Sequence, residues 1–493
     1  MAAPTPGGWP AGPPLLAALV SLQACGQGAE ARVAQRILER YGTSASARPL
    51  AAAQVIKLRL TGPGNARGAV EISWQGLDYR ERRESAGLVT VRGLQGGKAF
   101  YTDEDAVTRV ASEPAVRELT TRSYFWRRAF LFRDHEKEPP ALGPADEATA
   151  SVRFGLRLGN PLQLVFSRRD GALTAVHSPR FHLEFDGPTR FRDISDPASP
   201  IQAEIAWIGL PTGPLAGVSA GGGRARFRGA FADLPMEFSG TGPVVAAAVA
   251  GAPARVRIDG AAGGLVRISA ELARKTGLAF APDALGRQVA GPCELAFEGL
   301  VFPSVHLQRV GSGLDGVDAA VGGPVFRETV VELDAAAGRL RFHDPAVWPV
   351  PEGFQRFLID DDDNLPVAPL HRGSREFRVV LGVADPGGGI VLAPAAARRL
   401  GLSADLPEAR DLGWSNHVFP AVSVSIGTAP RAPDWGDDGT LAWRPLAGYR
   451  TFIDMSRRWI YLARVTLGVS SPSPPPPPPP QRRAQDARAS PKT

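Results

Sequence analysis

The chain has 493 residues, enough for about three domains of ordinary size. Its composition, 44% hydrophobic and 22% charged, is typical of soluble globular proteins and argues against global disorder and against a multi-spanning membrane protein. The net charge of +6 is a small excess at this length, and no basic block interleaved with aromatic residues is present, so no nucleic-acid partner is expected.

The first segment, residues 1–28, has features of an export leader. Residues 13–22 are apolar but span only about half the length that a bilayer requires. The following Leu22-Gln23-Ala24-Cys25 resembles the lipobox of bacterial lipoproteins, which implies acylation of Cys25 and a periplasmic or outer-membrane-anchored protein that meets the membrane only through this lipid. No Lys or Arg precedes the apolar run, so a mis-set start or a disordered leader with an incidental cysteine is the alternative.

Residues 29–215 predict a domain of antiparallel strands with two helices. Apolar residues at helical spacing predict a helix over 30–41 that is capped by Gly42, and a second helix over 114–130. Apolar and polar residues alternate elsewhere, which predicts half-buried strands. These strands are expected at 56–60, 70–74, 152–158, 162–166 and 181–185.

This order of elements, with the paired segments 88–93 and 95–100, resembles the curved half-barrel of periplasmic lipoprotein carriers. The resemblance implies a concave apolar surface able to hold an acyl chain or a peptide. A scaffold with an ordinary filled core is the alternative.

The region from 216 to 465 contains one unit twice. Each copy reads as a strand, a glycine-rich loop, a short helix that ends in Gly-Leu, and a late hairpin. The first copy runs through 251–278 to the hairpin at 330–342, and the second runs through 373–402 to the hairpin at 451–462.

The repeated unit resembles one lobe of the bacterial retropepsin-like aspartic proteases. The late turn of that family is matched by Ala320, Val321 and Gly322 in the first copy, whereas residues 440–442 offer Ala in place of the last glycine. The resemblance implies two tandem β-barrel lobes, residues 216–348 and 349–465. In such proteases two facing carboxylates share one proton and divide the acid and base roles on a trapped water.

The catalytic signature itself is degenerate in the first copy. Asp259 stands where the family has its aspartate, but Gly260 replaces the Thr or Ser that braces the paired loops. Ala261 replaces the following glycine. If the first lobe retains any activity, Asp259 is the residue expected to carry it.

The second copy admits two registers. If Asp385 is the counterpart of Asp259, the chain carries both carboxylates of a dyad. If Gly382 is the counterpart, the spacing to the flanking glycines fits better, and Asp385 to Gly387 is an ordinary turn. We prefer the second register. In that register, the second copy has no carboxylate at the position that corresponds to Asp259.

The remaining features predict no metal site and no cofactor. The run Asp360 to Asp363 is interpreted as a solvated charge run, and His177 and His182 lack a third ligand. Residues 466–493 contain seven consecutive prolines, Pro474 to Pro480, and predict a disordered tail.

The fold expected is therefore mainly β with minor α: a curved half-barrel, two retropepsin-like lobes and a tail. The function expected is that of an exported protease-fold protein with a degenerate dyad, which binds a peptide between its lobes. An active aspartic endopeptidase that uses Asp259 and Asp385 is the first alternative. A carrier of lipid or lipoprotein is the second, so whether the chain is an enzyme stays open.

Overall fold

A computed structural model describes residues 29–43, 54–111, 113–131, 136–195, 200–210, 225–239, 241–362, 365–385, 387–403, 408–409, 411–415, 417–419, 422–427 and 438–464. Strands dominate this part of the chain, and its helices are short, which confirms the prediction of a mainly β fold with minor α. The proposed lipidation site Cys25 and the proline-rich tail lie outside the described residues. No helix within the described ranges is both long and apolar enough to cross a membrane.

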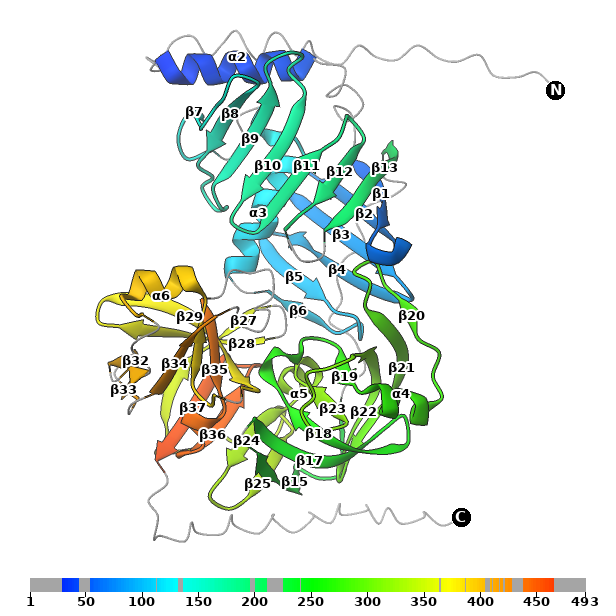
Figure 1. Cartoon of the computed structure of the whole chain (residues 1–493), viewed down its shortest axis with the longest axis vertical. Helices are drawn as coiled ribbons and strands as arrows, with labels where there is room; N and C mark the ends of the chain where they lie inside the picture. The colour runs from blue at the N-terminus through cyan, green and yellow to red at the C-terminus, as the bar shows by residue number, and fades with distance from the viewer. Residues whose placement is uncertain are drawn as a thin grey trace, which may run out of the picture.

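The N-terminal domain is one curved antiparallel sheet (Figure 1). Its first and last strands, β1 and β13, pair at the centre. The chain runs outward from β1 to β6 at one edge, and then from β7 at the other edge inward to β13. The described strands follow the order β6-β5-β4-β3-β2-β1-β13-β12-β11-β10-β9-β8-β7. Their bounds are β1 Val55–Thr61, β2 Arg67–Gln75, β3 Asp78–Ser85, β4 Leu88–Gln95, β5 Lys98–Thr102, β6 Thr108–Val110, β7 Ala141–Leu142, β8 Thr149–Phe154, β9 Leu162–Ser167, β10 Leu173–Ser178, β11 Phe181–Phe185, β12 Arg190–Asp193 and β13 Ile201–Gly209.

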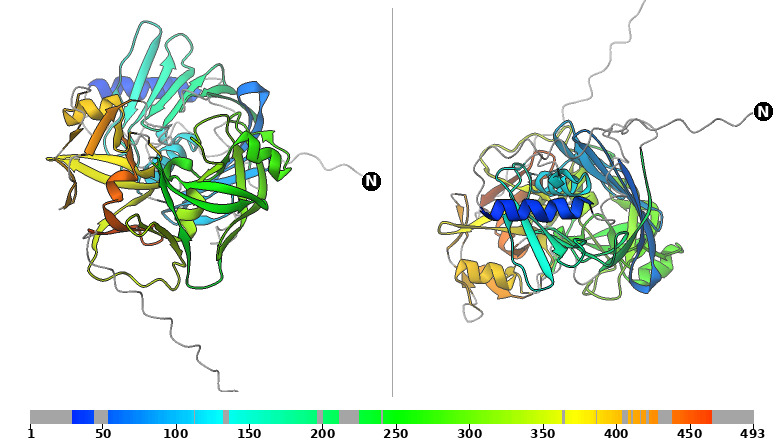
Figure 2. Two further views of the ribbon diagram at one scale, coloured as in Figure 1. Left: turned by 60° about the horizontal axis from the view of Figure 1, so that its bottom comes forward. Right: turned by 90° about the horizontal axis from the view of Figure 1, so that it is seen from above.

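Two helices, α2 (Ala29–Thr43) and α3 (Glu113–Trp126), share one buried cluster with the inner face of this sheet. Figure 2 shows α3 enclosed by the curve of the strands and α2 lying across it. The first helix runs through Gly42, so this glycine is not its cap, contrary to the prediction. The second ends at Trp126 rather than at 130, because Arg128 takes φ +57, outside the helical region, before a 3-10 turn at Ala129–Leu131.

The two lobes have the same topology. In lobe 1, β18 lies between β17 and the parallel strand β23, and β19 pairs with β23 and with β22. In lobe 2, β29, β28, β35, β30 and β34 repeat this arrangement in the same directions. The bounds in lobe 1 are β14 Arg226–Phe227, β16 Glu237–Ser239, β17 Gly242–Val249, β18 Ala252–Ile258, η4 Gly260–Ala262, β19 Val266–Ile268, α4 Ala270–Thr276, β20 Ala281–Pro282, β21 Gln288–Phe297, β22 Leu300–Arg309, β23 Ala319–Val321 and α5 Gly323–Glu328. Those in lobe 2 are β27 Asp360–Asp362, β28 Leu365–Arg372, β29 Arg375–Val383, β30 Ile390–Leu392, α6 Pro394–Leu400, β31 Glu408–Ala409, β32 Leu412–Trp414, β33 His417–Val418, β34 Val422–Ile426, β35 Gly439–Ala442 and η5 Arg444–Leu446.

A third sheet joins the lobes, with the described order β15-β25-β24-β36-β37-β26. The late hairpins of the two copies meet in it, where β24 pairs with β36. Glu332 on β24 is buried there and binds Arg341 and His343 of its own lobe and Arg450 of the other, at 2.7 to 2.8 Å. The bounds are β15 Phe231–Pro235, β24 Val330–Asp334, β25 Arg339–His343, β26 Gln355–Leu358, β36 Tyr449–Asp454 and β37 Trp459–Arg464.

The half-barrel rests on lobe 1 through a buried polar junction. Arg327 of α5 forms ion pairs with Asp103 and, at 3.0 Å, with Asp105. His306 of β22 contacts the same Asp105 at 2.9 Å. The turn between β20 and β21 also enters the half-barrel, where Ala284 belongs to that domain's buried cluster. The loop after β18 therefore lies close to the concave face of the N-terminal sheet.

Candidate functional site

Asp259 lies directly after β18, at the point where the strand leaves the sheet. Its amide donates to the carbonyl oxygen of Val321 at 2.9 Å, which continues the parallel pairing of β18 with β23. Its Oδ1 accepts the amide of Ala261 at 3.0 Å and thereby caps the 3-10 turn Gly260–Ala262. Because the side chain is only 4% exposed, the backbone and this cap fix its orientation.

Two glycines allow other segments to approach the Asp259 loop closely. A Cβ atom on Gly322 would lie 2.3 Å from the carbonyl oxygen of Asp259, so the late turn after Ala320 and Val321 needs glycine for space. A Cβ atom on Gly260 would lie 1.8 Å from the carbonyl oxygen of Leu381 in lobe 2. Gly260 thus allows direct backbone contact between the two loops.

Gly382 occupies the matching place in lobe 2. The parallel ladder pairs Leu381 with Leu441, as it pairs Ile258 with Val321 in lobe 1. Gly382 therefore follows Leu381 as Asp259 follows Ile258. The loop still reaches lobe 1, because the amide of Ala384 donates to Oδ1 of Asp259 at 3.4 Å.

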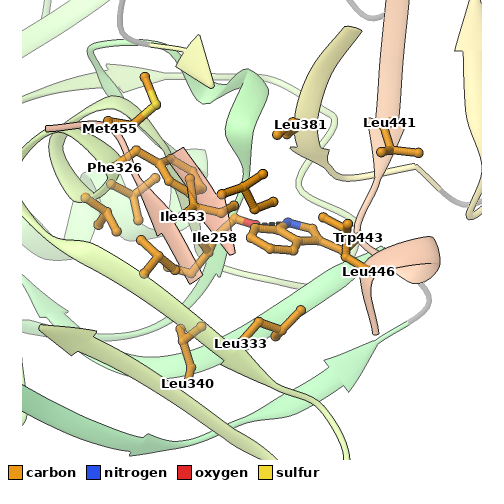
Figure 3. Packing of buried hydrophobic residues seen from close by; sticks show 14 of the residues in the cluster. Ile258, Phe326, Leu333, Leu340, Leu381, Leu441, Trp443, Leu446, Ile453 and Met455 are labelled. Atoms are coloured by element: carbon orange, nitrogen blue, oxygen red, sulfur yellow. Dashed lines mark hydrogen bonds between the residues drawn. The ribbon is translucent and has the colours of Figure 1, made fainter. Parts of the chain in front are cut away.

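Trp443 fills the space beside Gly382. A Cβ atom on Gly382 would lie 2.7 Å from Cζ2 of the Trp443 ring, and Gly382 has φ +66, so the position excludes a larger residue on both counts. The indole Nε1 donates to the carbonyl oxygen of Ile258 at 2.9 Å (Figure 3). The ring is fully buried and stacks with Phe326 at a centroid distance of 6.2 Å. An indole of lobe 2 thus occupies the space that a side chain at position 382 would enter.

Asp385 forms hydrogen bonds within its own loop. Its Oδ1 accepts the amide of Gly387 at 3.1 Å, and its Oδ2 accepts that of Gly389 at 3.4 Å. Among the described residues no hydrogen bond joins Asp385 to Asp259. A dyad requires two carboxylates that contact one water, whereas both carboxylate oxygens of Asp385 accept backbone amides of its own loop.

A cavity of about 580 Å³ lies between the half-barrel and the loop that follows Asp259. Ala261 and Ala262 line the cavity on the side of lobe 1, and Leu365 of lobe 2 also lines it. The half-barrel contributes a largely apolar wall, which includes Leu58, Leu60, Ile72, Trp126, Phe181 and Leu183. The volume falls in the range usual for small-molecule sites, about 300 to 1,000 Å³.

Charged side chains gather where the half-barrel meets lobe 1 around this cavity. Arg92 binds Glu81 at 2.7 Å, and Arg287 binds Asp283 at 2.7 Å. Burial alone would raise the pKa of Glu81, but the charges of Arg92 and Arg122 lower it to about 2. Arg83 and Arg267 also line the cavity.

The other side chains that the sequence offers as metal ligands either form ion pairs or lie without a third ligand beside them. Asp360 pairs with Arg378 at 3.3 Å and with Arg458, and His177 faces His182 across β10 and β11. No cluster of three metal-ligating side chains occurs in the described ranges.

Sequence reasoning missed Trp443, Arg83 and Arg267. Counting from the late turn places Trp443 directly after the counterpart of Gly322, but its contact with lobe 1 depends on how the lobes pack. Arg83 stands in a run of charged residues, Asp78 to Glu84, in which nothing local marks it as facing inward.

Comparisons with known proteins add little to this geometry. No protein-family model matches the chain, and neither does any curated protein. Among the solved structures that match is a crystal structure of an aspartic proteinase from Irpex lacteus, at a TM-score of 0.33 and 11% identity. The match covers 48% of this chain and 98% of that chain. A likeness this weak assigns no activity to the chain.

Proposed function

We propose that this chain is a ligand-binding protein with an aspartic-protease-like pair of lobes and without peptidase activity. The observation that carries the proposal is the Trp443 ring, which lies against Gly382 where the second catalytic carboxylate would extend. A single carboxylate cannot divide the acid and base roles with a partner. Asp259 instead holds the two loops together through the amides of Ala261 and Ala384.

The ligand of this proposal occupies the cavity between the half-barrel and the Asp259 loop. Its apolar wall favours a hydrocarbon chain, since transfer of apolar surface out of water stabilises a complex by about 25 cal/mol per Å². A carrier-like role for the half-barrel is therefore favoured over peptide binding between the lobes, where the backbones of Gly260 and Leu381 are in contact. An endopeptidase that uses Asp259 and Asp385 is the competing function.

The site is tested with the full chain and an uncharged probe, 1-hexadecanol, which displaces an environment-sensitive dye. Ala203 is buried on β13 and lines the cavity, so Ala203→Trp is expected to weaken binding by at least about tenfold by filling the space. Gln202→Trp is the matched control, because Gln202 is the exposed neighbour on the same strand. Equal binding by wild type and Ala203→Trp, with both proteins folded by circular dichroism, would place the ligand elsewhere.

Export with acylation at Cys25 is part of the same proposal. It is supported by the short apolar run before Leu22-Gln23-Ala24-Cys25. A protein anchored in this way would present its cavity to amphiphiles near a membrane surface.

A further inference from the structure

Two guanidinium groups at the cavity, those of Arg83 and Arg267, have no carboxylate partner among the residues that the structure describes. Arg92, Arg122 and Arg287, which also line it, each have a carboxylate within 4.0 Å. Within the described part of the chain, the guanidinium group of Arg83 has neither an ion pair nor a hydrogen bond, although the residue is half-buried. Arg267 donates only to the carbonyl oxygen of Ala261, at 2.7 Å.

The carboxylates that attract these two groups electrostatically also have other hydrogen-bond or ion-pair partners. Asp193 and Asp283 attract Arg83 electrostatically, but Asp193 accepts from Ser195 at 2.6 Å and Asp283 is bound by Arg287. Asp259 attracts Arg267 while its Oδ1 accepts backbone amides. The other two carboxylates that line the cavity are Glu81, which Arg92 binds, and Glu104.

Arg83 and Arg267 reach the cavity from opposite domains. Arg83 lies on β3 of the half-barrel, where Glu81, Arg83 and Ser85 alternate toward the cavity. Arg267 lies on β19 of lobe 1. Both are within electrostatic range of Arg287, which places them in the same charged region. Burial lowers the pKa of each guanidinium, so each charge is held in a poorly solvated place that an anion would stabilise.

We propose that the cavity binds a single-chain amphiphile whose anionic head, a carboxylate or a phosphate, is held by Arg83 and Arg267 while its hydrocarbon chain lies against the half-barrel. This inference rests on the proposed function and names the chemical class of its ligand. Guanidinium groups donate to both oxygens of such a head in a fixed fork, and hydrogen bonds between charged groups are stronger than those between neutral ones. The ligand would bridge the two domains.

The test compares four ligands with the same full-length protein: cis-parinaric acid as the fluorescent probe, and palmitate, hexadecyl phosphate and 1-hexadecanol as competitors. Wild type is expected to bind palmitate or hexadecyl phosphate at least about tenfold more tightly than 1-hexadecanol. The better of the two anions identifies the head group. Equal affinity for palmitate, hexadecyl phosphate and 1-hexadecanol would overturn the inference but leave the proposed cavity intact. Failure of all four ligands to bind would contradict both the inference and the proposed function.

Variants assign the effect to the two arginines. Arg83→Gln and Arg267→Gln are each expected to weaken anion binding by about tenfold and to leave 1-hexadecanol unchanged. Arg82→Gln is the matched control, because Arg82 is on the same strand, does not line the cavity and pairs with Glu84 at 2.8 Å. Arg83→Lys keeps the charge and should retain part of the selectivity. Unchanged anion selectivity in folded Arg83→Gln and Arg267→Gln would contradict the assignment.

Discussion

The indole Nε1 of Trp443 donates a hydrogen bond to the carbonyl oxygen of Ile258, 2.9 Å away, across the boundary between the lobes. Ile258 is the residue directly before Asp259, so the contact ties the lobe 2 late turn to the lobe 1 loop. The same ring covers Gly382. One side chain thus connects the two lobes and fills the space beside Gly382.

Trp443→Phe should destabilise the protein by about 1 to 3 kcal/mol, because it leaves the buried carbonyl oxygen of Ile258 without this donor. Trp443→Ala should cost about 3 to 5 kcal/mol, because it also leaves a cavity. Urea unfolding measures both. Trp207→Phe is the control, since Trp207 is 44% exposed on β13. An equal loss in Trp207→Phe and Trp443→Phe would refute the brace.

Gly382→Asp places a carboxylate at the position in lobe 2 that corresponds to Asp259, but it should not create a dyad. Its Cβ would meet the Trp443 ring at 2.7 Å, and φ +66 disfavours any side chain, so we expect a loss of stability without peptidase activity. Combining it with Trp443→Ala should cost less than the two single losses added together, because the ring that clashes is gone. Strict additivity in urea unfolding would show that Trp443 does not occupy this space.

Acid should weaken the joint between the lobes through Glu332. Burial alone would raise its pKa, but the His343 hydrogen bond and the charges of Arg450 and Arg341 lower it to about 2. Because the folded pKa lies below the unfolded value of about 4.3, the carboxylate stabilises the fold above that pH, and this contribution, about 3 kcal/mol, is lost as the pH falls toward 2.

Glu332→Gln should therefore be much less stable than wild type at neutral pH, and the difference should shrink as the pH falls from about 4.5 to 2. Thermal unfolding over this range measures it. Glu71→Gln serves as the control, since its ion pair with Lys57 is exposed and such pairs contribute about 0 to 1 kcal/mol. A gap that stays constant with pH would contradict the assigned pKa.

The lipidation proposal predicts that the wild-type protein is exported and incorporates labelled palmitate, whereas Cys25→Ala incorporates none. Cell fractionation with radiolabelled palmitate checks both points. Cys293→Ala controls for label on the other cysteine of the chain. A wild-type protein that is cytoplasmic and unlabelled would contradict the proposal of export.

Much of the fold could be predicted because its signals are local. Alternating residues such as Ile56, Leu58 and Leu60 identify strands, and the two copies identify repeated lobes before any contact is known. The end of α3 at Trp126 could not be predicted, because no residue type nearby indicates the positive φ that Arg128 adopts.

The site could be predicted only in part. The position of Asp259 follows from the repeat, and the spacing of the second copy identifies Gly382 as its counterpart. The Trp443 brace and the Arg83 and Arg267 pair join segments far apart in the sequence, so they depend on packing between lobes and between domains that spacing does not encode.

The most direct test of the central claim is incubation of an unfolded protein substrate with wild type, Asp259→Asn and Asp385→Asn between pH 3 and 7. The account predicts no cleavage by any of them above a catalyst-free control, because Trp443 covers Gly382, the counterpart of Asp259, and Asp385 accepts amides of its own loop. Cleavage by wild type that is lost in both folded variants would contradict it and make Asp259 and Asp385 a working catalytic pair.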